Sequence, residues 1–323
     1  MKSTGDSAVI DVGVICGPTA GGKSAIAMWL AERRPITIVS ADSRQVYRGF
    51  DIGTAKPTAD ERTRVPHLGL DVVDPTVRYS SAVWAKAAHG WIADTLSLGR
   101  TPIVVGGTGL YLRALFEGLF AEPPIDAERR RRLEPELAAL TTEELKRWVE
   151  RLDPPRAHLG RAQLLRAIEI ALLTGHRVSD LHAAHRGAGQ GEARWRPRYL
   201  LVDPGPALAQ RIGARLDMML NAGWPTEVER LMHSVPPDAP AWKATGYETV
   251  RRMARGEVAR AEARETILIE TRQYAKRQRT WFRHQLPPDR VLSVNPLARD
   301  WEEVVARWTT GIVYGGTAER AGR

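Results

Sequence analysis

Cysteine is almost absent from this chain of 323 residues, and long apolar runs are missing as well. With Cys16 as the only cysteine, the chain can form neither a disulfide framework nor a zinc finger built on cysteine pairs, and we expect Cys16 to pack as a small apolar residue. No apolar run reaches the roughly eighteen residues of a membrane-spanning helix, so we expect no membrane association. Residues 1–6 lack the apolar core of a signal peptide, which makes the cytoplasm the expected location.

The positive charge is concentrated in the later part of the chain. The formal net charge is +9, and the first 120 residues carry 13 Lys and Arg against 11 Asp and Glu, while the remainder carries 34 against 27. This asymmetry favours a polyanionic partner, and nucleic acid in particular. Because arginine outnumbers lysine 40 to 7, a compositional bias of the genome is the alternative explanation.

A glycine-rich octapeptide is the most informative motif. It follows an apolar run at residues 9–16 and precedes a helical pattern, which is the context of a phosphate-binding P-loop. We expect its backbone N–H groups and the Lys23 ammonium to bind phosphate, and the Ser24 hydroxyl to hold Mg²⁺ at the start of the helix. The predicted phosphate-binding residues are Gly17, Pro18, Thr19, Ala20, Gly21, Gly22, Lys23 and Ser24.

Apolar runs alternate with helical patterns over most of the chain, which predicts an α/β fold: a P-loop NTPase-like parallel sheet flanked by helices. Strands are expected at residues 9–16, 36–40, 70–73, 102–105, 199–202 and 291–294. Helices are expected after the P-loop, between Ser80 and Leu98, from residue 208 towards Gly223, and at 301–308. Ligands of such folds bind at the carboxyl ends of the strands.

Residues 126–182 carry helical spacing without strand patterns, which predicts an inserted all-helical domain, with Gly175 as a C-cap. The glycine-rich stretch 187–191 is expected to be a hinge or loop. We therefore divide the chain into a first part of the core at 1–122, a helical insertion at 123–197, a second part of the core at 198–314, and a flexible tail at 315–323.

A polar segment follows the second predicted strand. Residues 40–47 read Ser-Ala-Asp-Ser-Arg-Gln-Val-Tyr, and a carboxylate at this point would face the P-loop across the sheet edge. Asp42 could bind Mg²⁺ there or accept a proton from an attacking nucleophile. It could instead cap the next helix.

The segment from Arg272 to Arg283 holds five cations and no acid, with Tyr274, Trp281 and Phe282 between them. Like charges on one helix repel each other unless phosphates or acidic neighbours compensate, so we expect this helix to face RNA. We expect its aromatic side chains to anchor the helix to the core more than to stack on bases.

Four blocks, in this order, resemble the bacterial tRNA dimethylallyltransferase family, also called IPP transferases. They are the P-loop, residues 39–57, the sequence Gly-Gly-Thr-Gly-Leu-Tyr at 106–111, and residues 271–283. The resemblance implies transfer of a dimethylallyl group from dimethylallyl diphosphate to N6 of the adenosine immediately 3′ of a tRNA anticodon. It also implies that the P-loop and Mg²⁺ hold the diphosphate leaving group, and that the anticodon stem-loop is the partner. A monomer is expected.

The resemblance implies roles for individual residues as well. Asp42 would accept the N6 proton or orient the amine, Thr108 would lie near the reacting atoms, and Arg211 and Arg215, one helical turn apart, would approach the diphosphate. Residues expected to contact tRNA are Asp42, Ser43, Arg44, Gln45, Thr108, Arg130, Arg166, Lys243, Lys276, Arg277, Gln278, Arg279 and Arg283.

Several alternatives stay open at this stage. Arg130, and the pair Arg211 and Arg215, could be solvated charges, and Thr108 could be a turn residue. The insertion departs from the family pattern, because Gln163 stands where a basic residue is expected. A small-molecule P-loop kinase would explain the P-loop but not the basic helix, and a non-enzymatic RNA-binding protein would use the nucleotide only as a structural ligand.

Overall fold

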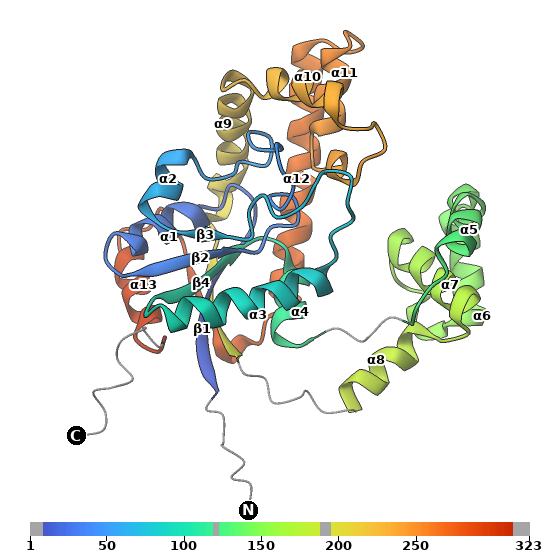
Figure 1. Cartoon of the computed structure of the whole chain (residues 1–323), viewed down its shortest axis with the longest axis horizontal. Coiled ribbons are helices and arrows are strands. Elements are labelled where there is room, and N and C mark those ends of the chain that lie inside the picture. The colour runs from blue at the N-terminus through green and yellow to red at the C-terminus, as the bar shows by residue number, and fades with distance from the viewer. Residues whose placement is uncertain (1–8, 119–122, 188–194, 313–323) are drawn as a thin grey trace, which may run out of the picture. The chain divides into compact units, whose positions relative to one another are not determined.

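The computed structural model describes residues 9–118, 123–187 and 195–312, and the chain divides into two compact units (Figure 1). One unit is built from residues up to Phe116 and from Ala193 onward, and the other is Glu117–Glu192. Among the described residues, no helix is both long and apolar enough to cross a membrane.

The first unit is organised around a sheet of parallel strands. The strands are β1 Ile10–Cys16, β2 Ile36–Ser40, β3 His67–Leu68, β4 Thr101–Gly106, β5 Trp195–Val202 and β6 Val291–Val294, in the spatial order β3-β2-β4-β1-β5-β6. Each neighbouring pair runs parallel, which confirms the predicted α/β fold. The loops that follow β1, β2, β4 and β5 therefore leave the same edge of the sheet.

Helices cover both faces of this sheet. On one face, α1 (Lys23–Ala31) and α13 (Trp301–Thr309) pack against Ile15 and Leu200 of the central strands. On the other face lie α3 (Ser81–Ser97) and α4 (Gly109–Phe116), where Phe116 meets Tyr199 edge to face. Since neighbouring residues of a strand point to opposite faces, β5 supplies both cores, and this buries the sheet on both sides.

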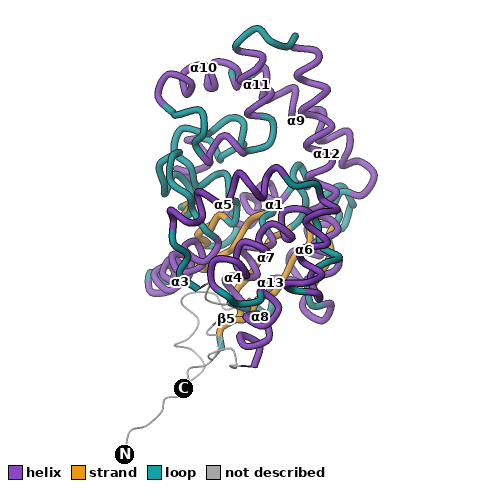
Figure 2. Tube along the Cα trace, turned by 90° about the vertical axis from the view of Figure 1, so that its right-hand side faces the viewer, coloured by secondary structure: helices purple, strands orange, loops and turns teal. Residues whose placement is uncertain are grey.

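A group of helices stands beyond the carboxyl edge of the sheet, at the top of Figures 1 and 2. It contains α9 Leu208–Asn221, α10 Trp224–Ser234, α11 Tyr247–Ala254 and the long α12 Arg260–Gln285, which runs back along the sheet. The remaining elements of this unit are α2 Ala59–Arg64 and short 3₁₀ helices at Gly205–Ala207, Pro240–Lys243 and Pro288–Arg290. Ala275 and Phe282 of α12 are buried, so this helix is anchored in the core despite its charge.

The described elements of the second unit are all helices, joined by turns and short loops. It consists of α5 Ala127–Ala139, α6 Thr142–Leu152, a 3₁₀ turn at Pro154–Arg156, α7 Arg161–Thr174 and α8 Val178–Gly187. Leu145, Val149, Leu164 and Ile168 form its own apolar core. Gly175 ends α7 in the left-handed conformation, with a φ of 74°, which confirms the predicted C-cap.

Two strand predictions need correction. Residues 70–73 do not form a strand, because β3 has already ended and the chain turns at Gly69 and Asp71, both with positive φ. The Asp71 carboxylate there pairs with Lys56 and Arg62. The strand expected at 199–202 begins earlier, at Trp195, because it pairs with β1 along its whole length. Residues 188–191 of the expected hinge and the tail at 315–323 lie outside the described residues.

Candidate active site

The P-loop connects β1 to α1, as expected. Gly17 has a φ of +144°, and a Cβ on it would come within 2.2 Å of the Val202 carbonyl oxygen, so only glycine fits at the end of β1. Helix α1 begins at Lys23 without a side-chain cap. The N–H groups of its first turn have no intrahelical partners and can therefore bind an anion.

Lys23 folds back over this loop. Its Nζ donates hydrogen bonds to the carbonyl oxygens of Gly17 at 3.0 Å and of Pro18 at 2.8 Å. Burial, and after it the nearby positive charge of Arg215, lower the pKa of Lys23 to about 8. A bound anion would stabilise the charged ammonium and would restore a higher pKa.

Gln278 of α12 fixes the P-loop from the side. Its Oε1 accepts a hydrogen bond from the Thr19 backbone N–H at 2.8 Å, and its Nε2 donates to the Gly107 carbonyl oxygen at 2.9 Å. The residue is 6% exposed. Gln278 therefore ties the loop after β1 to the loop after β4 through contacts within the protein, in place of the RNA contact expected from the sequence. The Thr19 N–H, expected to bind phosphate, is occupied by the same contact.

Asp42 and Thr108 are brought together by the ends of β2 and β4. These ends approach so closely that a Cβ on Gly106 would lie 2.1 Å from the Ala41 carbonyl oxygen. Oδ1 of Asp42 accepts a hydrogen bond from the Arg44 N–H at 2.8 Å, and the Ser43 N–H donates to Oγ1 of Thr108 at 3.1 Å. Turns follow Asp42, so the alternative that it caps a helix is wrong.

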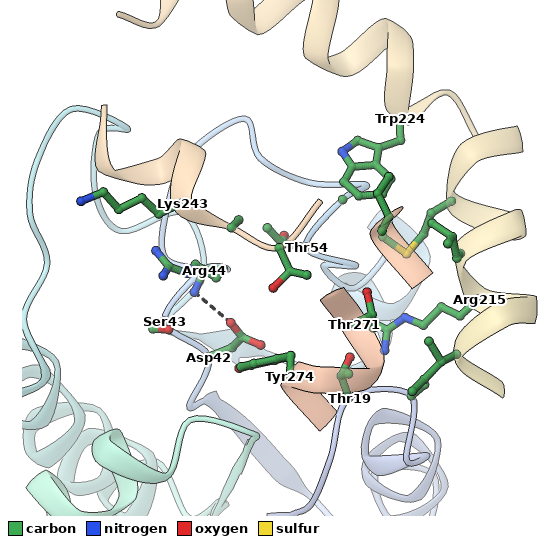
Figure 3. A pocket seen from close by; sticks show the side chains of 18 of the residues that line it. Thr19, Asp42, Ser43, Arg44, Thr54, Arg215, Trp224, Lys243, Thr271 and Tyr274 are labelled. Carbon is green, nitrogen blue, oxygen red and sulfur yellow. Dashed lines mark hydrogen bonds between the residues drawn. The ribbon is translucent and has the colours of Figure 1, made fainter. Parts of the chain in front are cut away.

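Asp42 lies between two pockets. One, of about 670 Å³, is lined by the P-loop, Lys23, Ser24 and Arg211. The other, of about 310 Å³, is shown in Figure 3. Both pockets are lined by Thr19, Ala20, Asp42, Thr54, Arg215 and Tyr274. A ligand at the P-loop and a second ligand in the smaller pocket would thus meet beside the Asp42 carboxylate.

The smaller pocket has a polar and an apolar side. In Figure 3, Asp42, Tyr274, Thr19 and Arg215 lie around its floor, and Trp224 lies at its far side. Its apolar lining comes from α9, α10 and α12 and consists of Ile212, Leu216, Met219, Trp224 and Ile267. The arrangement can hold a planar or apolar group against a carboxylate and a guanidinium.

Arg211 and Arg215 of α9 both reach the P-loop side of the site. Nε of Arg211 donates a hydrogen bond to the Ala20 carbonyl oxygen at 2.9 Å. Arg215 lines both pockets, and burial lowers its pKa. Because both side chains lie at the pockets, the alternative of a solvated helix face does not apply to them.

The residues expected to contact tRNA separate into two groups. Around the smaller pocket the structure places Asp42, Ser43, Arg44, Lys243 and Arg277. Thr108 lies beside them through its bond to Ser43. Lys276 and Arg283 are exposed on α12. Arg44, Lys243 and Arg277 come from distant parts of the sequence and form a basic border to the smaller pocket.

The second group is held by contacts within the protein. Gln45 accepts a hydrogen bond from the Ser40 hydroxyl and donates to the Thr54 and Ala55 carbonyl oxygens. Arg279 pairs with Asp203 of the loop after β5. In the helical unit, Arg130 and Arg166 both pair with Glu169. To contact tRNA, each of these side chains would have to give up a contact within the protein and bind a phosphate of the tRNA instead.

Tyr274 is a site residue that the sequence interpretation placed in the core. It lines both pockets, and burial raises the pKa of its phenol. Thr271, Tyr274 and Gln278 lie at helical spacing on one face of α12. That spacing is the signal that could have found this face.

The donor atoms of the larger pocket suit magnesium bound together with a substrate. Among residues 9–118, 123–187 and 195–312, no group of three or more His, Cys, Asp or Glu could hold a metal ion by itself. The Ser24 hydroxyl and the Asp42 carboxylate do line the same pocket. Magnesium commonly takes one or two protein oxygens and completes its shell with phosphate oxygens and water.

Comparison with known proteins identifies the family. The family model described as IPP transferase matches residues 45–285. The chain belongs to this family. Two curated family members are named tRNA dimethylallyltransferase: that of Deinococcus radiodurans is 40% identical over 288 residues, which cover 84% of this chain and 90% of that protein. That of Nitrobacter hamburgensis is 41% identical over 293 residues, covering 89% and 92%.

Solved structures of IPP transferases have the same fold. The tRNA isopentenylpyrophosphate transferase of Bacillus halodurans is 31% identical, with a TM-score of 0.65 over 93% of this chain and 94% of that chain. A eukaryotic dimethylallyltransferase acting on tRNA is 26% identical, with a TM-score of 0.70 over 94% and 76%. The family resemblance expected from the sequence is confirmed, and a small-molecule kinase is not favoured.

Proposed function

We propose that this IPP transferase moves a dimethylallyl group from dimethylallyl diphosphate to N6 of the adenosine immediately 3′ of the anticodon in tRNA. The observation that carries the proposal is the position of Asp42, between an anion-binding loop and a second pocket bordered by cations. A kinase would need only the larger pocket at the P-loop. The basic border of the smaller pocket suits a polyanionic acceptor such as RNA.

The P-loop side would stabilise the leaving group. As the allylic C–O bond breaks, negative charge grows on the diphosphate. The N–H groups at the start of α1, the Lys23 ammonium and Arg215 lie where they can stabilise that charge. Mg²⁺, held by Ser24 and the diphosphate oxygens, would supply further positive charge there.

The Asp42 side would activate the acceptor. The amine of adenine is a weak nucleophile because its lone pair is delocalised into the ring. As the C–N bond forms and the C–O bond breaks, Asp42 takes one proton from N6, and diphosphate leaves with the electrons of the broken bond. The Arg44 N–H on Oδ1 of Asp42 fixes the orientation of this carboxylate.

The adenine must leave the anticodon stack to reach Asp42. Enzymes that modify a base commonly extrude it into a pocket. Arg44, Lys243 and Arg277 border the smaller pocket and would bind the phosphates next to the extruded nucleotide. One chain supplies both pockets, so we propose a monomer that acts on tRNA in the cytoplasm.

The test is an incubation of the protein with unmodified tRNA and radiolabelled dimethylallyl diphosphate. We expect label in tRNA, at the adenosine 3′ of the anticodon, together with free diphosphate. A parallel reaction with ATP and small hydroxyl acceptors serves as the comparison. Consumption of ATP on such an acceptor, with no label in tRNA, would overturn the proposal in favour of a kinase.

A further inference from the structure

Two loops form part of the border of the smaller pocket. The first is the turn at residues 51–54, of which Gly53 and Thr54 line the pocket. The second is the stretch 243–246, whose residues Lys243 to Thr245 also line it. The loops are far apart in the sequence, and both contact the first turn and a half of helix α10.

Glu227 of α10 joins these two loops through one buried carboxylate. Its Oε2 accepts hydrogen bonds from the Asp51 N–H at 3.0 Å and from the Ile52 N–H at 2.7 Å. Its Oε1 accepts one from the Tyr247 hydroxyl at 2.7 Å, and the Gly53 N–H lies 3.5 Å from the same oxygen. Glu227 is 5% exposed. A buried carboxylate is stable here because donors surround it.

Trp224, one helical turn earlier, fills the space between the loops. A Cβ on Gly53 would come within 2.2 Å of its indole, and a Cβ on Gly246 within 2.6 Å, so both loops pack directly on the ring. The side chain is 1% exposed, and its ring meets Tyr247 edge to face. Figure 3 shows the indole at the border of the pocket.

The P-loop has a separate support. Gln278 holds Thr19 and Gly107 from α12, and neither of these residues contacts the carboxylate of Glu227 through the bonds described above. The structure thus fixes the two sides of the site from two different helices. A substitution that weakens the contacts of one of these helices should therefore impair the binding of one substrate more than that of the other.

We propose that Glu227 is a positioning residue for the acceptor: it holds the two loops that shape the pocket for the extruded base. The inference rests on the proposed function. Glu227 does not touch the reacting atoms, since its oxygens are occupied by Asp51, Ile52 and Tyr247. It acts through Gly53, Lys243 and their neighbours, which line the smaller pocket.

The test compares Glu227→Gln with Glu229→Gln, an exposed position of the same helix. The amide keeps one acceptor oxygen and turns an NH₂ group towards N–H donors, so the loops lose part of their support. Because hydrogen bonds to a charged group are strong, we expect the KM for tRNA to rise about tenfold in E227Q, with the KM for dimethylallyl diphosphate within about twofold of wild type. E229Q should match wild type for both substrates. Equal increases in both KM values, or no change in the KM for tRNA, would overturn the proposal.

A second variant covers the case in which E227Q folds poorly. Tyr247→Phe removes one donor and keeps the aromatic packing, so we expect a rise of about threefold in the KM for tRNA alone. Amide hydrogen exchange at residues 51–53 supplies a readout that needs no activity, and these amides should exchange faster in E227Q. Wild-type protein that fails to prenylate tRNA would overturn the proposed function. Active wild type with unchanged Y247F kinetics and unchanged exchange in E227Q would overturn this inference alone.

Discussion

Replacement of Gln278 by leucine tests whether the P-loop depends on the support from α12. Leucine fills a similar volume but leaves the Thr19 N–H and the Gly107 carbonyl oxygen without their partner. A buried polar group that loses its partner costs about 1–3 kcal/mol, so the two groups together should lower the free energy of unfolding by about 2–6 kcal/mol. The smaller value applies if water reaches Thr19, which is half-buried.

The effect on substrate binding should be selective. Without Gln278 the P-loop samples other conformations, and ordering the loop then costs part of the free energy of diphosphate binding. We therefore expect the KM for dimethylallyl diphosphate to rise about tenfold or more. The KM for tRNA should stay near the wild-type value, because Glu227 still holds the acceptor side.

Steady-state kinetics with each substrate varied in turn, together with urea unfolding, measure both effects. Gln273→Leu is the matched control, since Gln273 is exposed on the same helix. If Q278L keeps the wild-type KM for dimethylallyl diphosphate while it loses stability, Gln278 supports only the fold. If it raises the KM for tRNA instead, the assignment of donor and acceptor sides is wrong.

Three further predictions concern the chemistry and the RNA surface. Asp42→Asn should lower kcat by at least about a hundredfold, as expected for loss of a general base, while equilibrium binding of both substrates stays near wild type; near-normal turnover would exclude the role. Lys276→Ala combined with Arg277→Ala should weaken tRNA binding and reduce the slope of log K against log salt, and an unchanged slope would place these residues away from RNA. Because the pKa of Lys23 is lowered to about 8, its ammonium loses its charge as the pH rises through that value. The apparent Kd for dimethylallyl diphosphate should therefore rise about tenfold per pH unit above about pH 8. Lys23→Met should abolish this pH dependence of the Kd.

The features that local sequence determines were predicted correctly. Strand β2 is a short apolar run whose five residues are all buried, and β6 has the predicted bounds. The P-loop could be recognised because its glycines are required by backbone geometry, as the contact between Gly17 and Val202 illustrates. The Ser80 cap of α3 is likewise a local signal, since its hydroxyl accepts from the Val83 N–H.

The features that depend on contacts across the fold could not be predicted. Residues 70–73 are apolar enough for a strand, but ion pairs of Asp71 with Lys56 and Arg62 stabilise a turn that no local pattern indicates. Glu227 reads as an ordinary acid in the first turns of a helix until the loop at residues 51–53 is folded against it.

The sequence alone also could not show which cations on α12 are exposed and which pair with acids of the protein. Arg277 and Arg279 are two residues apart, so they project from different sides of the helix. Arg277 reaches the smaller pocket, whereas Arg279 pairs with Asp203 and contacts the Gly205 carbonyl oxygen. The count of charges predicted an RNA-facing helix, but it could not separate the cations that compensate protein acids from those that remain for phosphates.

Gln278 stabilises the donor side of the site and Glu227 stabilises the acceptor side. This separation suggests how the enzyme favours transfer to tRNA over transfer to water. Asp42 lines both pockets, and Lys23 donates hydrogen bonds to two carbonyl oxygens of the P-loop. The Lys23 ammonium has three N–H donors, so one remains for the diphosphate, while the acceptor amine would enter the smaller pocket to reach the carboxylate. Water in place of the base would lack the contacts that we propose for tRNA with Arg44, Lys243 and Arg277. Transfer to the base should therefore exceed hydrolysis of dimethylallyl diphosphate for as long as the loops at 51–54 and 243–246 keep the acceptor pocket in shape.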